Sequence, residues 1–430
     1  MNRIQAEDYI YASYLRAERF QNYESKDSIK RNPALTKAII DSLNRTPCVL
    51  ITGSKGKGSV ANMISQILQS RHRVGLMTSP HITAFNERFR VNNLPISDSE
   101  FVSTVEALKE PFDQIESTLP SNVCISPMGI QAAIGLLYFS NKHTSYNVFE
   151  LGKGAKYDDV NNINSSYSVI NSIFLEHTRE LGETAEKIAE DKSYIIKKNQ
   201  LGVFVAEQEP EALRILKERA ANQGVPISIY GQDFRADNIR YTNNGMMFDV
   251  IIKDQRFTDF LIPLLGEHQA KNCALALALC YRILPNWDIG DIKKRLAQLE
   301  WPGRMEIISC SPLVLLDACI NKSSTENIKQ VLAHLGIARC VFIVGIPDDK
   351  DYEGVVCSIQ KLSVATILTK SQNPHYHFSD VQEKRLQEKG VITIKSNSVE
   401  DAINIAKQFD LPVAILGTTS IISDVKKMKW

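Results

Sequence analysis

The sequence predicts an α/β fold in two domains, because apolar strand-like runs alternate with helical patterns along most of its 430 residues. The strand-like runs are apolar throughout, which is typical of parallel strands covered by helices on both faces. The chain also exceeds the length at which one hydrophobic core usually stops growing. We therefore expect a first domain over residues 1–300 and a second over residues 301–430.

The first part of the chain is expected to form a mostly parallel sheet with helical crossovers. Buried strands are predicted at residues 48–52, 74–77, 147–151, 168–173 and 202–206, and helices at residues 59–69, 98–108, 129–139 and 184–192. Residues 239–252 differ, because apolar and polar side chains alternate around the turn signal Asn243-Asn244-Gly245. This pattern predicts a β-hairpin.

A break near residue 300 separates the two α/β patterns. A long helix rich in Ala and Leu is predicted over residues 268–284, and Pro302 and Gly303 then interrupt the pattern as a linker or hinge would. The second pattern has expected strands at residues 313–316, 341–344, 365–368 and 413–416, and expected helices at residues 324–335, 352–361 and 399–409.

The amino-acid composition argues against several classes of protein. The 50 basic and 49 acidic residues leave a formal net charge of +1, which favours neither nucleic acid nor a membrane surface as partner. No apolar run approaches the ~20 residues of a membrane helix, and the N-terminal residues show no signal pattern. The eight cysteines include no C-x-x-C pair, so neither a zinc site nor a disulfide framework is expected. A cytoplasmic location is the expectation.

The segment between the first predicted strand and helix has the features of a phosphate-binding loop. Gly53, Gly56 and Gly58 let the backbone approach a ligand closely, and the following helix start directs N–H groups and its positive dipole end at an anion. Lys57 adds a mobile positive charge, and Ser59 adds a hydroxyl that can hold Mg²⁺. The loop is shorter than the common G-x-x-x-x-G-K-[ST] pattern. We expect it to bind a nucleoside triphosphate.

Further polar residues lie near the ends of predicted strands, where open α/β sheets bind ligands. Ser79 and Glu150 offer the oxygen ligands that Mg²⁺ prefers, whereas His177 is a less usual ligand for that ion. Lys192 lies late in a predicted helix. Each residue also has an ordinary structural interpretation, as a helix cap, a hydrogen-bonded histidine or a solvated lysine. Because these residues follow a phosphate loop in this order, we favour a ligand-binding site over the structural interpretations.

At this point the motifs resemble a known family. From about residue 30 to the C-terminus the chain is similar to folylpolyglutamate synthase/dihydrofolate synthase, within the Mur-type ATP-dependent amide ligases. The similar motifs are GSKGKGS at 53–59, TSPHITAFNERFRVN at 78–92, ELGKGAKYD at 150–158, LEHT at 175–178, IAEDKSYIIK at 188–197, LGEHQAKN at 265–272, WPGRME at 301–306 and DKD at 349–351.

The resemblance implies a fold, cofactors and residue roles. The implied fold is a P-loop nucleotide-binding N-terminal domain with a smaller Rossmann-like C-terminal domain, which close over the substrates. The implied cofactors are ATP and Mg²⁺ at two sites. At the matched positions, the resemblance implies ATP phosphate binding by Gly53, Gly56, Lys57, Gly58 and Ser59, and further nucleotide contacts by Asn272, Arg304 and Asp317. It implies metal ligation by Ser59, Ser79, Glu150 and His177. The implied catalytic residues are Lys57, His177 and Lys192, with Lys192 carbamylated.

The implied reaction activates a carboxylate as an acyl phosphate and joins it to an amino acid, with glutamate and a folate-like acceptor as the family's main substrates. A monomer that works on these small molecules is expected. Departures from the family pattern lie at Ile320, where the family has histidine, and at Lys153, Lys156, Glu176, Tyr194, residues 127–129 and residues 417–423. A different acid or amine, and a weakened homologue kept for binding or regulation, remain alternatives.

Overall fold

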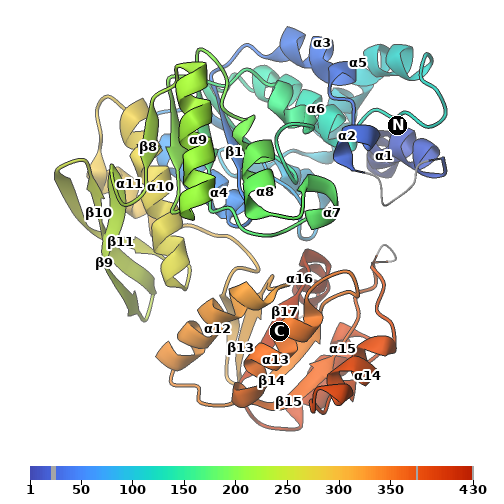
Figure 1. Ribbon diagram of the computed structural model, residues 1–430, viewed down its shortest axis with the longest axis vertical. Helices are drawn as coiled ribbons and strands as arrows, with labels where there is room; N and C mark the ends of the chain where they lie inside the picture. Colours follow the sequence, from blue (N-terminus) through green and yellow to red (C-terminus); the bar gives the residue numbers. More distant parts are fainter. Residues whose placement is uncertain (21–25, 374–375, 429–430) are drawn as a thin grey trace.

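The protein folds around three β-sheets in two α/β domains (Figure 1). The computed structural model describes residues 1–20, 26–373 and 376–428. An eight-stranded sheet and a three-stranded sheet form before residue 263, and a six-stranded sheet forms entirely after residue 305. Both α/β patterns expected from the sequence are thus confirmed. The exact boundary between residues 300 and 301 stays a prediction.

The eight-stranded sheet has the order β4-β3-β2-β5-β1-β6-β7-β8. Its strands are β1 (Cys48–Thr52), β2 (Val74–Met77), β3 (Phe89–Val91), β4 (Leu94–Pro95), β5 (Tyr146–Glu150), β6 (Tyr167–Ile170), β7 (Gly202–Val205) and β8 (Ile227–Ile229). All neighbours pair in parallel from β2 to β8, and only β3 and β4 add antiparallel edges. The strand predicted at 168–173 ends earlier, at Ile170, and Asn171 after it donates a side-chain hydrogen bond to Asn272.

Helices cover both faces of this sheet, as the continuously apolar strands predicted. One face packs on helices α1 (Arg3–Glu18), α3 (Ala34–Leu43), α5 (Asp98–Glu116), α6 (Pro127–Asn141), α8 (Ala185–Ser193) and α9 (Pro210–Gln223). The other face packs on α4 (Lys57–Leu68), α10 (Glu267–Ile283) and α11 (Ile289–Leu296). The short helices α2 (Asp27–Lys30) and α7 (Thr178–Leu181) complete this domain.

The predicted hairpin is confirmed, but it belongs to a three-stranded sheet of β9 (Phe234–Thr242), β10 (Gly245–Ile252) and β11 (Gln255–Ile262). The sequence did not indicate β11, because half of its side chains are exposed and only Phe260 and Ile262 are fully buried. These two side chains pack in the same core as α10, and this packing fixes the strand.

The second domain has the strand order β12-β13-β17-β14-β15-β16. Its strands are β12 (Glu306–Cys310), β13 (Leu313–Asp317), β14 (Cys340–Gly345), β15 (Ser363–Leu368), β16 (Ile394–Lys395) and β17 (Val413–Gly417), and its helices are α12 (Lys322–His334), α13 (Tyr352–Ile359), α14 (Val381–Glu388), α15 (Val399–Lys407) and α16 (Thr419–Lys426). Only β12 runs antiparallel to its neighbour. Among the described helices, none combines the length and apolar character required to cross a membrane.

Candidate active site

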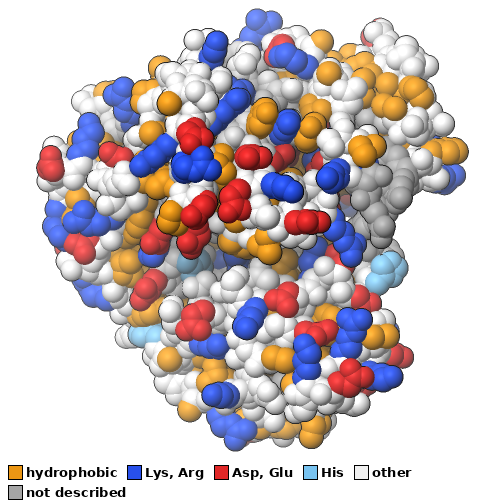
Figure 2. Space-filling model, in the orientation of Figure 1, with side chains coloured by type: hydrophobic (Ala, Val, Ile, Leu, Met, Phe, Trp, Pro, Cys, Tyr) orange, Lys and Arg blue, Asp and Glu red, His pale blue; other side chains and the backbone are white. Residues whose placement is uncertain are grey.

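A cavity of about 1440 Å³ lies where the two domains meet. Its wall comes from the loops after β1, β2, β5 and β6, from the linker near Trp301, and from the loops after β13, β14 and β17. All of these loops follow the carboxyl ends of parallel strands, where α/β sheets bind ligands. Figure 2 shows the furrow between the two domains on one face, with charged side chains of both signs along it.

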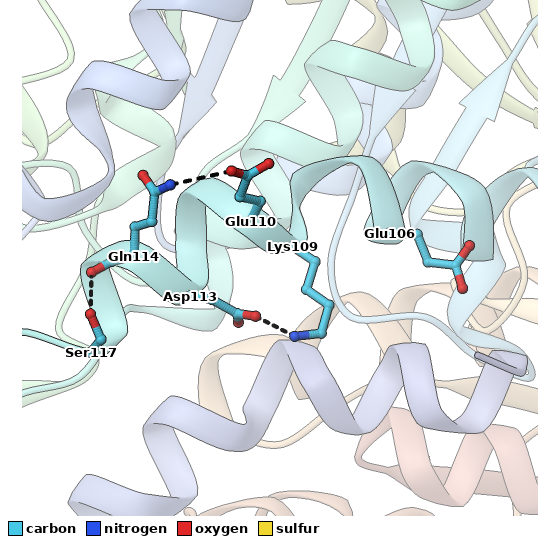
Figure 3. A pocket seen from close by; sticks show the side chains of 6 residues that line it. All are labelled: Glu106, Lys109, Glu110, Asp113, Gln114 and Ser117. Carbon is cyan, nitrogen blue, oxygen red and sulfur yellow. Dashed lines mark hydrogen bonds and ion pairs between the residues drawn. The ribbon is translucent and has the colours of Figure 1, made fainter.

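A second, shallow depression lies on the outer surface of α5 (Figure 3). Its lining comes from that single helix: Glu106, Lys109, Glu110, Asp113, Gln114 and Ser117. These polar side chains pair among themselves, as Lys109 does with Asp113. One helix surface with its own ion pairs offers no converging groups, so the interdomain cavity is the candidate site.

Most of the predicted site residues meet in this cavity. Its wall includes Gly56, Lys57, Gly58, Ser59, Ser79, Glu150, His177 and Arg304. The other four lie outside the wall: Gly53, Lys192, Asn272 and Asp317. Hydrogen bonds join Gly53 directly to Lys57 and Lys192, so it lies just behind the wall.

The glycine loop has the conformation expected of a phosphate cradle. β1 ends at Thr52 and α4 begins at Lys57, with Gly53 at φ +142° and Gly56 at φ +79°. A Cβ on Gly56 would lie 2.5 Å from Asn171 Nδ2, so a larger residue would displace neighbouring side chains. The first turn of α4 lines the cavity, and its free N–H groups suit an anion.

Lys57 and Glu150 lie at the mouth of this loop. Lys57 Nζ donates a hydrogen bond to the Gly53 carbonyl at 3.0 Å. Glu150, the last residue of β5, is only 5% exposed, and its Oε2 accepts a hydrogen bond from the Ser79 backbone N–H at 3.0 Å. Burial raises the pKa of Glu150, while the positive charges of Lys57 and Arg304 oppose that rise.

This donor set fits Mg²⁺ bound together with a nucleotide. A Cβ at Gly58 would lie 3.3 Å from Glu150 Oε2, so the carboxylate stands directly at the start of α4, near the hydroxyl-bearing Ser59. Within the described ranges, no group of three or more His, Cys, Asp or Glu side chains converges on one point. Magnesium is usually held by one or two carboxylates with phosphate oxygens and water, so such a cage is not required.

Lys192 is completely buried behind the phosphate loop. Its Nζ donates to the carbonyl oxygens of Gly53 at 3.1 Å and Lys153 at 2.6 Å, and it forms an ion pair with Glu176 at 3.1 Å. Burial is the main cause that lowers the pKa of Lys192 to about 8, and the nearby charge of Lys57 acts in the same direction. A substantial fraction of this amine is therefore neutral near pH 8.

His177 lines the cavity from the start of α7, with a left-handed backbone at φ +47°. Burial lowers the pKa of its imidazole, which favours the neutral ring whose nitrogen can act as a ligand. The charged groups that act on it are Glu176, Lys153, Glu180 and Lys350. Its role as a metal ligand stays a prediction.

The predicted nucleotide contacts lie on both sides of the cavity. Asn272 Oδ1 accepts a hydrogen bond from Asn171 Nδ2 at 3.0 Å, beside the phosphate loop. Asp317, at the end of β13, accepts from the Met305 N–H at 2.9 Å through one oxygen. Its other oxygen is buried and has no hydrogen-bond partner in the described part of the chain. A buried acceptor without a donor is the kind of group that a ligand hydroxyl satisfies.

Several cavity residues were given no role from the sequence, among them Lys55, Arg90 and Trp301. Lys55 Nζ donates a hydrogen bond to Ser324 Oγ of α12 and so joins the phosphate loop to the second domain. The available signal for Lys55 was a second lysine within the glycine loop. The contact with Ser324 depends on domain packing, which a sequence pattern does not indicate.

Positions that depart from the family pattern also reach this site. Ile320 lines the cavity, and Asn321 caps α12 by accepting a hydrogen bond from the Ser324 N–H. Lys153 Nζ pairs with Glu180 at 2.8 Å, while Glu176 pairs with Lys192. Of the departing positions, Lys153, Glu176 and Ile320 therefore line the same cavity as the phosphate loop.

Comparison with known proteins agrees with this geometry. Residues 51–280 match the model of the Mur ligase middle domain. The chain is 28% identical to a folylpolyglutamate synthase of Lacticaseibacillus casei and 29% identical to a dihydrofolate synthase/folylpolyglutamate synthase of Bacillus subtilis. The two alignments cover 88% of this chain and 88% and 89% of the respective relatives.

Solved structures show the same fold. A Mycobacterium tuberculosis folylpolyglutamate synthase in complex with ADP and AMPPCP superposes with a TM-score of 0.87 at 22% identity, over 97% of this chain and 98% of that one. A complex described as FPGS-AMPPCP-folate superposes with a TM-score of 0.83 at 26% identity, over 99% of both chains. The chain therefore belongs to the folylpolyglutamate synthase/dihydrofolate synthase family of Mur-type, ATP-dependent amide ligases.

Proposed function

We propose that this ligase joins the amino group of glutamate to a carboxyl group of a folate-type acceptor. The observation that carries the proposal is the meeting of the phosphate loop, Lys57 and Glu150 at one end of a large interdomain cavity. The substrates are inferred from the names of the relatives and from the solved complex with AMPPCP and folate.

In the proposed first step, the acceptor carboxylate attacks the γ-phosphate of ATP, which gives an acyl phosphate and ADP. Negative charge gathers on the transferring phosphoryl group, and Lys57 and Arg304 are the cavity's cations placed to offset it. In the second step, the amine of glutamate attacks the acyl carbon and phosphate leaves. Loops of both domains line the cavity, so domain closure would exclude the water that hydrolyses acyl phosphates.

We assign the metal and nucleotide contacts to the residues predicted from the sequence. Ser59, Ser79, Glu150 and His177 would together hold two Mg²⁺ ions, which would supply positive charge beside the phosphates. Asn272 and Asp317 would contact the nucleotide. A boundary between residues 300 and 301 would place the hinge beside Arg304. The monomeric state and the cytoplasmic location stay predictions.

Replacement of Glu150 by Gln is expected to weaken Mg²⁺-nucleotide binding by at least ~10-fold while the fold is retained. Glutamine keeps the shape and can accept the Ser79 N–H bond, but it lacks the charge that attracts a cation. Calorimetric titration of AMPPCP with and without Mg²⁺ measures this directly. An equal Mg²⁺ dependence in the variant and the original protein would remove Glu150 from the metal site.

A different acid or amine remains a second candidate substrate, favoured by Ile320. Its side chain lines the cavity at the position where the family has histidine, so one hydrogen-bonding group of the usual substrate site is missing. The ligase chemistry would be unchanged, and only the identity of one substrate would differ.

Turnover assays test the proposal. Incubation with dihydropteroate or tetrahydrofolate, ATP and glutamate is expected to release ADP and to give products heavier by glutamyl units, as measured by mass spectrometry. ADP release should require both the acceptor and the amino acid. Turnover of another acid or amine without folate products would support the second candidate. ATP binding without turnover in a broad substrate screen would instead support a homologue kept for binding.

A further inference from the structure

Arg90 brings a further, unassigned positive charge to the cavity wall. It lies in β3 between the buried residues Phe89 and Val91, and its side chain lines the interdomain cavity with 16% of its surface exposed. The steps proposed above use Lys57 and Arg304, and they leave Arg90 without a task. A guanidinium this far removed from solvent requires a partner.

The protein itself pairs this charge incompletely. Arg90 Nε is buried and has no hydrogen-bond partner among the residues that the structure describes. Within the described part of the chain, the side chain reaches a carboxylate only at Glu87, with 4.0 Å between Arg90 Nη2 and Glu87 Oε2. Glu87 already accepts hydrogen bonds from the backbone N–H groups of Ile82, Thr83 and Ala84. The Arg90 N–H groups therefore remain available to a ligand.

Trp301 holds the guanidinium in place and adds a second free donor. The Arg90 guanidinium carbon lies 5.3 Å from the centre of the Trp301 ring, a distance typical of a cation–π contact. The indole Nε1 is also buried and without a partner in the described ranges. The ring packs 3.0 Å from where a Cβ on Gly58 would lie, so the pair stands next to the phosphate loop.

We propose that Arg90 and Trp301 form a carboxylate-binding subsite that orients one of the two carboxylate-bearing substrates of the ligase. The inference rests on the proposed function, because it assigns a substrate contact within that same cavity. Guanidinium groups match carboxylates through paired N–H donors, and each of these two neighbouring side chains carries a buried donor that a carboxylate oxygen would satisfy. The phosphate groups of ATP already have the glycine loop and Lys57, which leaves a carboxylate as the anion for Arg90.

Steady-state kinetics of substituted proteins test the subsite. Arg90→Met removes the charge and keeps the apolar stem, and it is expected to raise KM for one substrate by ~10- to 100-fold. Arg90→Lys keeps a charge without the Nε–H and should raise the same KM less. Trp301→Phe keeps a ring without the Nε1–H and should also raise that KM. AMPPCP affinity should stay within ~2-fold in all three. Arg214→Met, an exposed arginine paired with Glu218, is the control.

The substrate whose KM rises identifies the source of the carboxylate, either glutamate or the folate-type acceptor. Unchanged KM values for both substrates would overturn the subsite. A parallel loss of AMPPCP affinity would also overturn it, because Arg90 would then serve the nucleotide.

Direct binding measurements test the subsite independently of the proposed ligase reaction. Glutamate and tetrahydrofolate are titrated separately into the protein with AMPPCP and Mg²⁺, which requires no turnover. Loss of binding of one of these compounds in Arg90→Met would support the subsite even if no folate product forms. Affinities that are equal in the variant and the original protein, or an absence of binding by either compound, would overturn the subsite even if ligation is observed.

Discussion

Replacement of Lys57 by Ala is expected to reduce ATP consumption by ~10³-fold or more, with the fold retained. Lys57 places a mobile charge at the start of α4, where the phosphate loop lines the cavity. Removal of one preorganised charged donor at a transferring group typically costs ~10²- to 10³-fold in rate, and loss of nucleotide affinity adds to this. ADP release at substrate concentrations near the KM of the original protein measures both losses together.

The stability of this variant should change little. Lys57 makes one hydrogen bond, to the Gly53 carbonyl, and that carbonyl also accepts from Lys192 at 3.1 Å. A half-buried side chain with one replaceable contact usually changes the free energy of unfolding by less than ~1 kcal/mol. Lys37→Ala, an exposed lysine paired with Asp41, is the matched control. Retained turnover in Lys57→Ala would contradict the assignment of the phosphate loop.

Carbamylation of Lys192 is expected to increase with bicarbonate and with pH between 7 and 9. Only a neutral amine adds CO₂, and the pKa of Lys192 is lowered to about 8. The neutral fraction is therefore about a tenth at pH 7 and rises through pH 8, whereas a solvated lysine would stay protonated over this range. Carbon-13 NMR with labelled bicarbonate detects the carbamate. Ligase activity should follow the same pH and bicarbonate dependence.

Lys192→Met should lower activity by at least ~100-fold and also lower stability. The variant leaves the carbonyls of Gly53 and Lys153 without this donor and Glu176 without its ion-pair partner. Loss of partners in a buried site costs about 1–3 kcal/mol per group, so chemical denaturation should show a drop of about 2 kcal/mol or more. Lys192→Arg, which keeps the charge and is not carbamylated, separates the two effects. Full activity of Lys192→Arg, together with no carbamate signal from the original protein at any pH, would refute the modification.

Local patterns in the sequence determined much of the molecule. The phosphate loop was predictable, because its glycines, Lys57 and Ser59 lie within a few residues of one another and their chemistry is local. The parallel strands were predictable for a similar reason, since a strand buried on both faces is apolar at every position. Strand β1, for example, is buried at all of its positions and begins and ends where predicted.

Helix α1 and strand β11 were missed because few of their side chains are buried. Only Ala6, Ile10, Ser13 and Ala17 of α1 are buried, and the helix is fixed by its packing on α5 and α6. β11 depends in the same way on its contact with the core around α10. Tertiary burial gave these segments a stability that their local patterns do not reveal.

The sequence by itself determined the chemistry of the phosphate loop and the alternation of strands and helices along the chain. The tertiary structure alone decided which distant residues share the cavity: Lys55 with Ser324, Arg90 with Trp301, and Lys192 with Glu176 and Gly53. These contacts join segments from different strands, helices and domains. Their distances and the burial of their charges follow from how the sheets pack, and burial then shifts the pKa of Lys192 to about 8.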